Sequence, residues 1–272
     1  MVLRIVVAFG ISSCGFLSYS QAGHFDIVPY ATGTAAGSQL LTGGHNDLDS
    51  ITSQLVEVFG YDFGETDPYF AGDPGINNTS SFTNGVFPND GKMPAGTLVL
   101  SIFSGSYGPL HYWNGVGEPL FLPVSDGTEI NLNRNSSNLR VGAATASGSL
   151  NVATVPSAGG SAGRVHVHLT SSIGTGGSGS SFNTLGAPDG LYAFGATLSV
   201  GGLTSDPIYF VFNQGMSEAV HDDGMAFYQA HVVPEPSSLA LAGLGMAGAL
   251  AAGWRHRRRS AARNSAGVGT AR

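Results

Sequence analysis

Short apolar or alternating segments, separated by glycine, proline, asparagine and aspartate, recur through the middle of this 272-residue chain. Successive side chains of a β-strand point to opposite faces, so short segments of this kind between turn residues are typical of strands. Amphipathic helical periodicity is nearly absent from the same region. We therefore predict an all-β fold, a single β-sandwich of the jelly-roll type, between residues 23 and 232. The expected strands are 55–59, 97–103, 139–141, 150–155, 164–169, 191–200 and 208–212.

One segment near the end of this region has the features of a helix. Ser217 can cap a helix that runs to about His231, and Glu218 is favourable in its first turn. Gly224 weakens the expected helix, because glycine is a poor helix former. We expect this short C-terminal helix to pack on the edge of the sandwich. The glycine-rich stretches 157–163 and 174–181 are expected to be loops.

The N-terminus has the three parts of a secretory signal peptide, residues 1–22. Arg4 supplies a positive charge, residues 5–17 form an apolar stretch, and the small residues Ser20 and Ala22 occupy the two positions that a signal peptidase reads. Signal peptidase is then an expected processing partner, and the mature chain begins at Gly23.

Composition narrows what the mature region can do. Cleavage of the signal peptide also removes Cys14, the only cysteine, so disulfides and thiol chemistry are excluded there. The alternative to this signal-peptidase site is a lipoprotein box at residues 11–15, which contains Cys14. Residues 23–232 contain 17 acidic residues but only four lysines and arginines, a formal net charge of −13. Nucleic acid is excluded as a partner, because its binding rests on Lys and Arg that neutralise phosphates. The acidic balance suits divalent cations or simple solubility.

The C-terminal end has a tripartite pattern. Pro234, Glu235 and Pro236 precede an apolar run, 237–254, that is rich in small residues. As a helix, this run would measure about 27 Å at the usual rise per residue, close to the roughly 30 Å of a hydrocarbon core. We therefore predict one transmembrane helix. By the positive-inside rule, the arginines that follow this helix keep the C-terminus in the cytoplasm. These arginines are Arg255, Arg257, Arg258 and Arg259.

Residues 233–259 resemble the PEP-CTERM sorting signal of envelope-bearing bacteria, since box, span and arginine cluster occur in order. The resemblance implies that the chain is the substrate of an exosortase, a membrane protease-transpeptidase that cuts near the box and releases or re-attaches the outer domain. It also implies an exported protein, held transiently in the inner membrane and then presented at the cell surface or outside the cell. Residues 260–272 would remain as a disordered cytoplasmic tail.

A His-x-His pair lies in segment 164–169, which alternates without a break. His166 and His168 would share the outer face of a strand, roughly 7 Å apart. Such a pair can bind a transition-metal ion when a third ligand joins it, and imidazole with carboxylate suits Zn²⁺. The alternative is that both histidines only decorate an amphipathic strand. The candidates for the third ligand are His221 with Asp222, His24 with Asp26, and His45 with Asp47 and Asp49.

Three further patterns each have a chemical and a structural interpretation. The acidic segment 62–75 offers oxygen ligands to Ca²⁺, but its Asp, Pro and Gly content is also typical of turns. Residues 111–115 offer an aromatic platform for sugars, or a tryptophan that caps the core. Residues 159–163 match the G-x-S-x-G pattern of hydrolases, which requires a strand before it and a helix after it.

The body of the chain, residues 23–232, is similar to a group of secreted PEP-CTERM proteins of planctomycete-type bacteria. The similarity rests on short motifs that include 23–27, 43–47, 112–115 and 217–222. It implies one domain that ends in a short helix, and it implies no reaction. We therefore expect a non-enzymatic protein of the cell surface or extracellular matrix, with matrix polysaccharide as a partner. The alternatives are an extracellular divalent-metal-binding module built on the His-x-His strand, and a secreted glycan-binding or hydrolytic protein.

Overall fold

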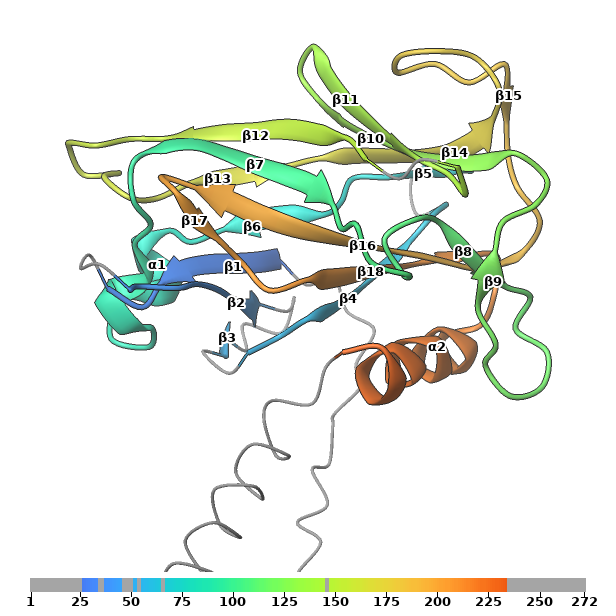
Figure 1. Ribbon diagram of the computed structural model, residues 1–272, viewed down its shortest axis with the longest axis horizontal. Coiled ribbons are helices and arrows are strands. Elements are labelled where there is room, and N and C mark those ends of the chain that lie inside the picture. Colours follow the sequence, from blue (N-terminus) through green and yellow to red (C-terminus); the bar gives the residue numbers. More distant parts are fainter. Residues whose placement is uncertain are drawn as a thin grey trace, which may run out of the picture. The chain divides into compact units, whose positions relative to one another are not determined.

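The computed structural model describes residues 26–33, 37–45, 51–52, 55–64, 67–144 and 147–233. The expected signal peptide, the Pro-Glu-Pro box and the expected membrane span lie outside these residues. Within them, no helix combines the length and the apolar character that crossing a bilayer requires. The described residues are mostly β-strand, in several sheets, with one longer helix at their C-terminal end (Figure 1). The all-β prediction is therefore confirmed at this level.

The first sheet joins early strands of the chain to the His-x-His strand. β1 pairs with β2 in antiparallel fashion and with β6 in parallel fashion. β13 lies antiparallel to β6, so that His168 is opposite Gly75 and His166 is opposite Asn77. In the order β13-β6-β1-β2-β3, its strands are His166–His168, Gly75–Asn77, Asp26–Ala31, Leu40–His45 and Ile51–Thr52.

The second sheet is built around β10 and β14, which pair in antiparallel fashion over most of their length. Its strands are β11 (Ser137–Val141), β10 (Thr128–Arg134), β14 (Thr170–Thr175), β15 (Thr184–Leu185) and, beside β14, β5 (Phe70–Ala71). Two short helical turns, α1 (Ser80–Thr83) and η1 (Pro88–Gly91), follow β6 of the first sheet in the sequence and precede β7 of the third sheet.

The third sheet has eight strands and contains the longest strand of the described chain. β16 pairs with β7, β18, β8 and β17, and β4 lies parallel to β18. This pairing places Asp62 opposite Asn213. The strands are β12 (Ser149–Val155), β7 (Gly96–Ile102), β16 (Gly190–Val200), β18 (Ile208–Gln214), β4 (Val58–Asp62), β17 (Leu203–Thr204), β8 (His111–Trp113) and β9 (Leu122–Pro123).

Both faces of this third sheet are covered. Phe210 and Phe212 of β18 belong to the main core, whereas Tyr209 and Val211 belong to a second cluster. Every residue of β18 is therefore buried, as expected for a strand with packing on both faces. The main core draws side chains from all three sheets. A jelly-roll sandwich has two sheets, whereas the described strands form three around this core.

The helix α2 (Glu218–His231) covers the second cluster. Its bounds and its N-cap, Ser217, agree with the sequence prediction, although the Ser217 side chain makes no capping hydrogen bond. The helix contacts β4 and β18, so it lies on the face of the sheet next to its edge strand rather than against the edge itself (Figure 1). Gly224 is buried there, and a Cβ at this position would collide with Cδ1 of Leu191. The glycine that disfavours the helix thus permits its close packing.

Candidate functional site

The His-x-His pair lies on β13 with the alternation that the sequence predicts. His166 and His168 are exposed, and Val167 between them is only 9% exposed. The two rings approach closely, with their Nε2 atoms 3.3 Å apart and their centroids 5.3 Å apart. Both imidazoles therefore direct a nitrogen toward the same small volume.

Asp26, at the start of β1, completes this group. β6 lies between β1 and β13 and pairs with both strands, which brings Asp26 to the histidines. Ligand atoms of Asp26, His166 and His168 all lie within 4.8 Å of one another. Gly75 of β6 leaves the necessary room, because a Cβ there would collide with Oδ1 of Asp26 and lie 3.2 Å from Cε1 of His168. We call these three residues the outer site.

Neighbouring polar groups orient the outer site. Nδ2 of Asn77 donates to Oδ2 of Asp26 at 3.2 Å. Oδ1 of Asp73 lies 3.6 Å from Nδ1 of His168, on the side of the ring away from Nε2. Carboxylate and amide partners of this kind fix the orientation and tautomer of metal-binding side chains. Two imidazole nitrogens and a carboxylate oxygen form a ligand set that suits Zn²⁺, with water in the remaining position.

The other candidates for the third ligand are placed elsewhere. His24, Asp47 and Asp49 lie outside the described residues. The structure describes His45 only as the backbone partner of Asp26 at the end of β2. The structure does not bring His221 to β13, because it lies on α2 in a separate group with Asp62 and Glu218.

His221 is fully buried under α2. Its Nε2 lies 3.0 Å from the carbonyl oxygen of Val211 on β18. Its Nδ1 lies 3.5 Å from Oδ1 of Asp62 at the end of β4. The acidic segment 62–75 thus divides between the two groups, since Asp62 lies beside His221 and Asp73 lies beside His168.

The opposite end of β4 carries a carboxyl with an altered pKa. Glu57 directly precedes the strand, and the residue is only 8% exposed. Burial raises the pKa of Glu57 to about 7, and the negative charge of Asp206 acts in the same direction. Burial also raises the pKa of Tyr209, and the nearby Glu57 adds to this shift. Stability near neutral pH therefore depends on the protonation of Glu57.

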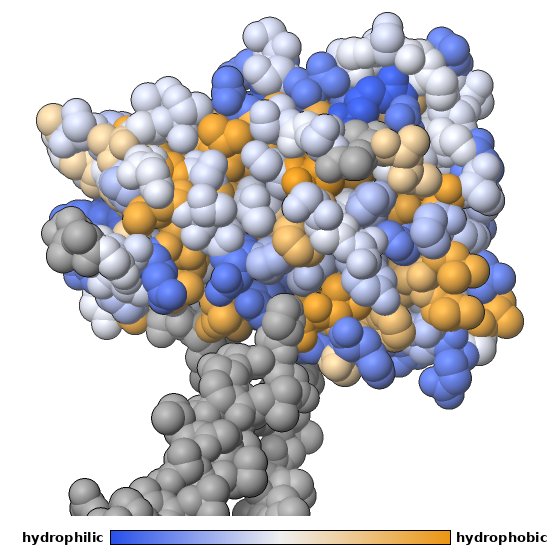
Figure 2. Space-filling view, viewed as in Figure 1, coloured by the Kyte–Doolittle hydropathy of each residue, from blue (hydrophilic) through white to orange (hydrophobic). Residues whose placement is uncertain are grey.

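The aromatic segment 111–115 does not form an open platform. Trp113 is only 4% exposed and packs against Phe121 at a centroid distance of 6.0 Å. The hydroxyl of Tyr112 donates to the carbonyl oxygen of Asp189. A pocket of about 440 Å³ lies beside these residues, and Figure 2 shows hydrophobic surface around β8 and β9. The exposed large hydrophobic side chains there are Val116, Leu120 and Leu122.

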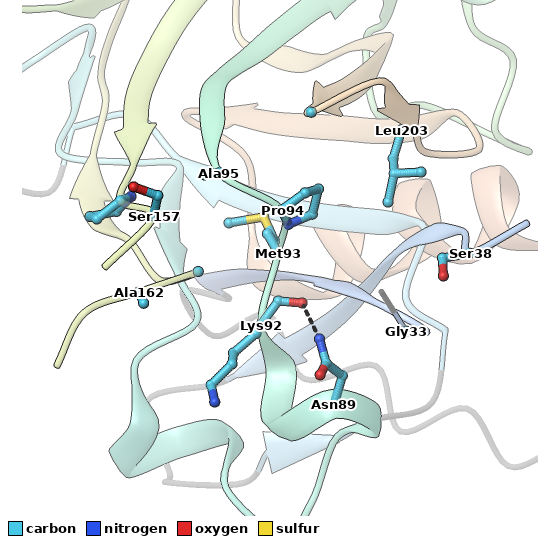
Figure 3. A pocket seen from close by; sticks show the side chains of 13 residues that line it. Gly33, Ser38, Asn89, Lys92, Met93, Pro94, Ala95, Ser157, Ala162 and Leu203 are labelled. Carbon is cyan, nitrogen blue, oxygen red and sulfur yellow. Dashed lines mark hydrogen bonds between the residues drawn. The ribbon is translucent and has the colours of Figure 1, made fainter. Parts of the chain in front are cut away.

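A second pocket, of about 610 Å³, borders the turn that contains the G-x-S-x-G match. Lys92 is the only titratable side chain among the residues that line it, so this lining contains no pair of carboxylates and no Ser–His pair. Figure 3 shows the Asn89 side chain bonded to the carbonyl oxygen of Lys92 at this pocket. The turn leads from β12 into β13 and not into a helix, as the hydrolase pattern would require.

Comparison with protein families matches residues 232–259 to the PEP-CTERM protein-sorting motif. This motif identifies the chain as an exosortase substrate and implies export and sorting to the cell surface. The match covers the candidate sorting residues from Pro234 to Arg259, which lie outside the described structure. Neither the curated proteins nor the solved structures include a match to the chain.

Proposed function

We propose that this exosortase substrate is a non-enzymatic protein of the cell surface or extracellular matrix. The sorting motif at 232–259 is the observation that carries the proposal. Signal peptidase would remove residues 1–22, the span 237–254 would hold the chain in the inner membrane, and the exosortase would then cut near the Pro-Glu-Pro box. The body would be left outside the cell.

The composition of the body supports a structural role in a matrix. Its net charge of −13 keeps it soluble once it is released, and its polar surface suits contact with polysaccharide. We also propose a layered arrangement of the jelly-roll type, with the eight-stranded sheet as one layer and the two smaller sheets as the other. The core shared by all three sheets supports this arrangement.

Sorting can be tested in a host that has an active exosortase. The full chain would carry an epitope between the signal peptide and β1, and its mass and location would be followed. We expect the parent protein to lose its C-terminal tail and reach the cell surface or the medium. The variant P234A/E235A/P236A should keep the tail and stay in the membrane.

The chain offers a matched control for this test. Glu118 and Pro119 form a similar acidic-proline dipeptide in a loop of the body, with Glu118 exposed. The variant E118A/P119A should be processed like the parent. Recovery of the parent protein uncleaved and soluble inside the cell would contradict the proposal.

A second proposed function is the binding of a divalent transition-metal ion at the outer site. The convergence of Asp26, His166 and His168 favours it, because these residues come from strands far apart in the sequence. Each contributes an atom that Zn²⁺ accepts as a ligand. The matrix protein would then also bind metal ions, and these ions would cross-link it to other matrix components.

Metal binding can be measured by calorimetric titration of the full chain, purified in detergent and freed of metal, with Zn²⁺. We expect the outer-site variant H166A/H168A to lose one binding event. The matched control is H231A, which removes an exposed histidine of α2. An unchanged titration in H166A/H168A would contradict a metal site on β13.

A further inference from the structure

The first turn of α2 contains a polar side chain in an unusual position. The exposed fraction of His221 is 0%, and it is enclosed between the helix and the eight-stranded sheet. Its Nε2 lies 3.0 Å from the carbonyl oxygen of Val211. A carbonyl oxygen only accepts hydrogen bonds, so Nε2 must carry a proton and donate it. In the neutral ring, Nδ1 then presents a lone pair.

This lone pair has no hydrogen-bond donor. Nδ1 of His221 is buried and makes no hydrogen bond. It faces Oδ1 of Asp62 at 3.5 Å. Ligand atoms of Asp62, Glu218 and His221 all lie within 4.8 Å of one another. The His221 side chain is fully buried and that of Asp62 is 28% exposed, and a lone pair and a carboxylate oxygen that face each other at this distance repel unless a cation lies between them. The geometry therefore calls for a positive charge at this point.

The surrounding structure holds the group in place. Nδ2 of Asn213 donates to Oδ1 of Asp62 at 2.7 Å, and the parallel pairing of β4 with β18 sets this contact. Gly60 of β4 lets the ring approach the strand, because a Cβ there would lie 3.0 Å from Cε1 and Nε2 of His221. A metal-binding histidine usually donates the N–H of its other ring nitrogen to a backbone carbonyl or a carboxylate, and the contact of Nε2 with the Val211 carbonyl has this form.

We propose that Asp62, Glu218 and His221 form a second divalent-metal site, which we call the inner site. One imidazole nitrogen and two carboxylates suit Zn²⁺ or a similar transition-metal ion, with water in the fourth position. The ligands come from the end of β4 and the first turn of α2, so the ion joins the helix to the sheet. Because α2 directly precedes the sorting motif in the sequence, the ion fixes the last element of the body before that motif.

The inner site does not depend on the outer site, and the test separates the two. The full chain with H166A/H168A, purified in detergent, lacks the outer histidines and isolates the inner site. A metal that binds only the folded state raises the melting temperature. We expect Zn²⁺ at 100 times its dissociation constant to raise the Tm of this protein by about 5 °C.

Substitution of the exposed ligand tests the site without disturbing the core. Glu218 is exposed, so E218Q in the same background should fold normally but show a much smaller rise in Tm with Zn²⁺. Asp223 is also exposed on α2 and lies outside the group, so D223N is the matched control and should keep the full rise. D62N should behave like E218Q.

Two results would overturn the inner site. One is a Tm that Zn²⁺ leaves unchanged in the H166A/H168A protein, which would mean that no metal ion binds between His221 and Asp62. The other is an equal response of E218Q and D223N to Zn²⁺.

Discussion

The outer and inner sites use the same ligand types in opposite settings. In both, imidazole and carboxylate groups converge beside a strand glycine, Gly75 in the outer site and Gly60 in the inner site. The histidines of the outer site are exposed, whereas His221 of the inner site is fully buried. The histidines of the outer site can thus change without damage to the core, whereas His221 of the inner site is part of the packing under α2. Exposure decides whether a histidine reports on metal binding alone or also on stability.

The substitution H221A should sharpen this contrast most. It would leave a cavity beneath α2 and deprive the Val211 carbonyl of its donor. We expect the free energy of unfolding to fall by about 3 kcal/mol without metal. The exposed counterpart H168A should change it by less than about 0.5 kcal/mol. Urea denaturation of the metal-free proteins measures both values, and equal losses would contradict the contrast.

Glu57, next to the start of β4, makes the stability of the protein depend on pH. This effect must be separated from that of metal binding at Asp62, at the other end of the strand. The pKa of Glu57 in the folded protein, about 7, exceeds its ordinary value of 4.5. The resulting stability is fully present below pH 4.5 and is lost as the pH rises through about 7. Above this range E57Q should be more stable than the parent by roughly 3 kcal/mol, and below it the two should agree.

Urea denaturation across this pH range, without metal, checks the effect of E57Q. The matched control is E118Q, because Glu118 is an exposed glutamate in a loop. A parent protein whose stability follows the same pH curve as E57Q would show that Glu57 is not buried as described.

The close packing of α2 can be tested at Gly224. Alanine favours the helix by about 1 kcal/mol, but the collision with Leu191 costs about 1–3 kcal/mol. We expect G224A to lose about 1 kcal/mol of stability on balance, measured by urea denaturation. Q229A on the exposed face of the same helix is the control and should not destabilise. A G224A protein as stable as Q229A would place the helix farther from the sheet.

The smallest expected effect on stability concerns Gly75. A methyl group there meets the far end of the Asp26 side chain, which can turn away, so the stability should change by less than about 0.5 kcal/mol. The displaced carboxylate should nevertheless weaken Zn²⁺ binding at the outer site about tenfold. Calorimetry of G75A in the E218Q background measures this site alone. Unchanged affinity would remove Asp26 from the ligand set.

The sequence predicts those features that depend on local patterns. Strand alternation predicts the exposed faces of His166 and His168, and capping residues predict the bounds of α2. The inner site has no such pattern, because Asp62 and His221 meet only through the parallel pairing of β4 with β18. The sequence names Asp26 as a candidate, but the reason for its position is that β6 pairs with both β1 and β13.

The glycines show a similar limit. Gly224 lowers the helix propensity of its segment, and only the position of Leu191 explains why it is there. The number of sheets is equally hidden, since short alternating segments indicate strands but not their partners. Three sheets arise because strands such as β4 and β13 pair with segments distant in the sequence.

Metal content, measured by mass spectrometry on the full chain after equilibration with Zn²⁺ and removal of free ion, tests the two-site account most directly. We predict two zinc ions per chain in the parent, one in H166A/H168A, one in E218Q, and none when these substitutions are combined. A zinc content that is the same in all four proteins would contradict both sites at once.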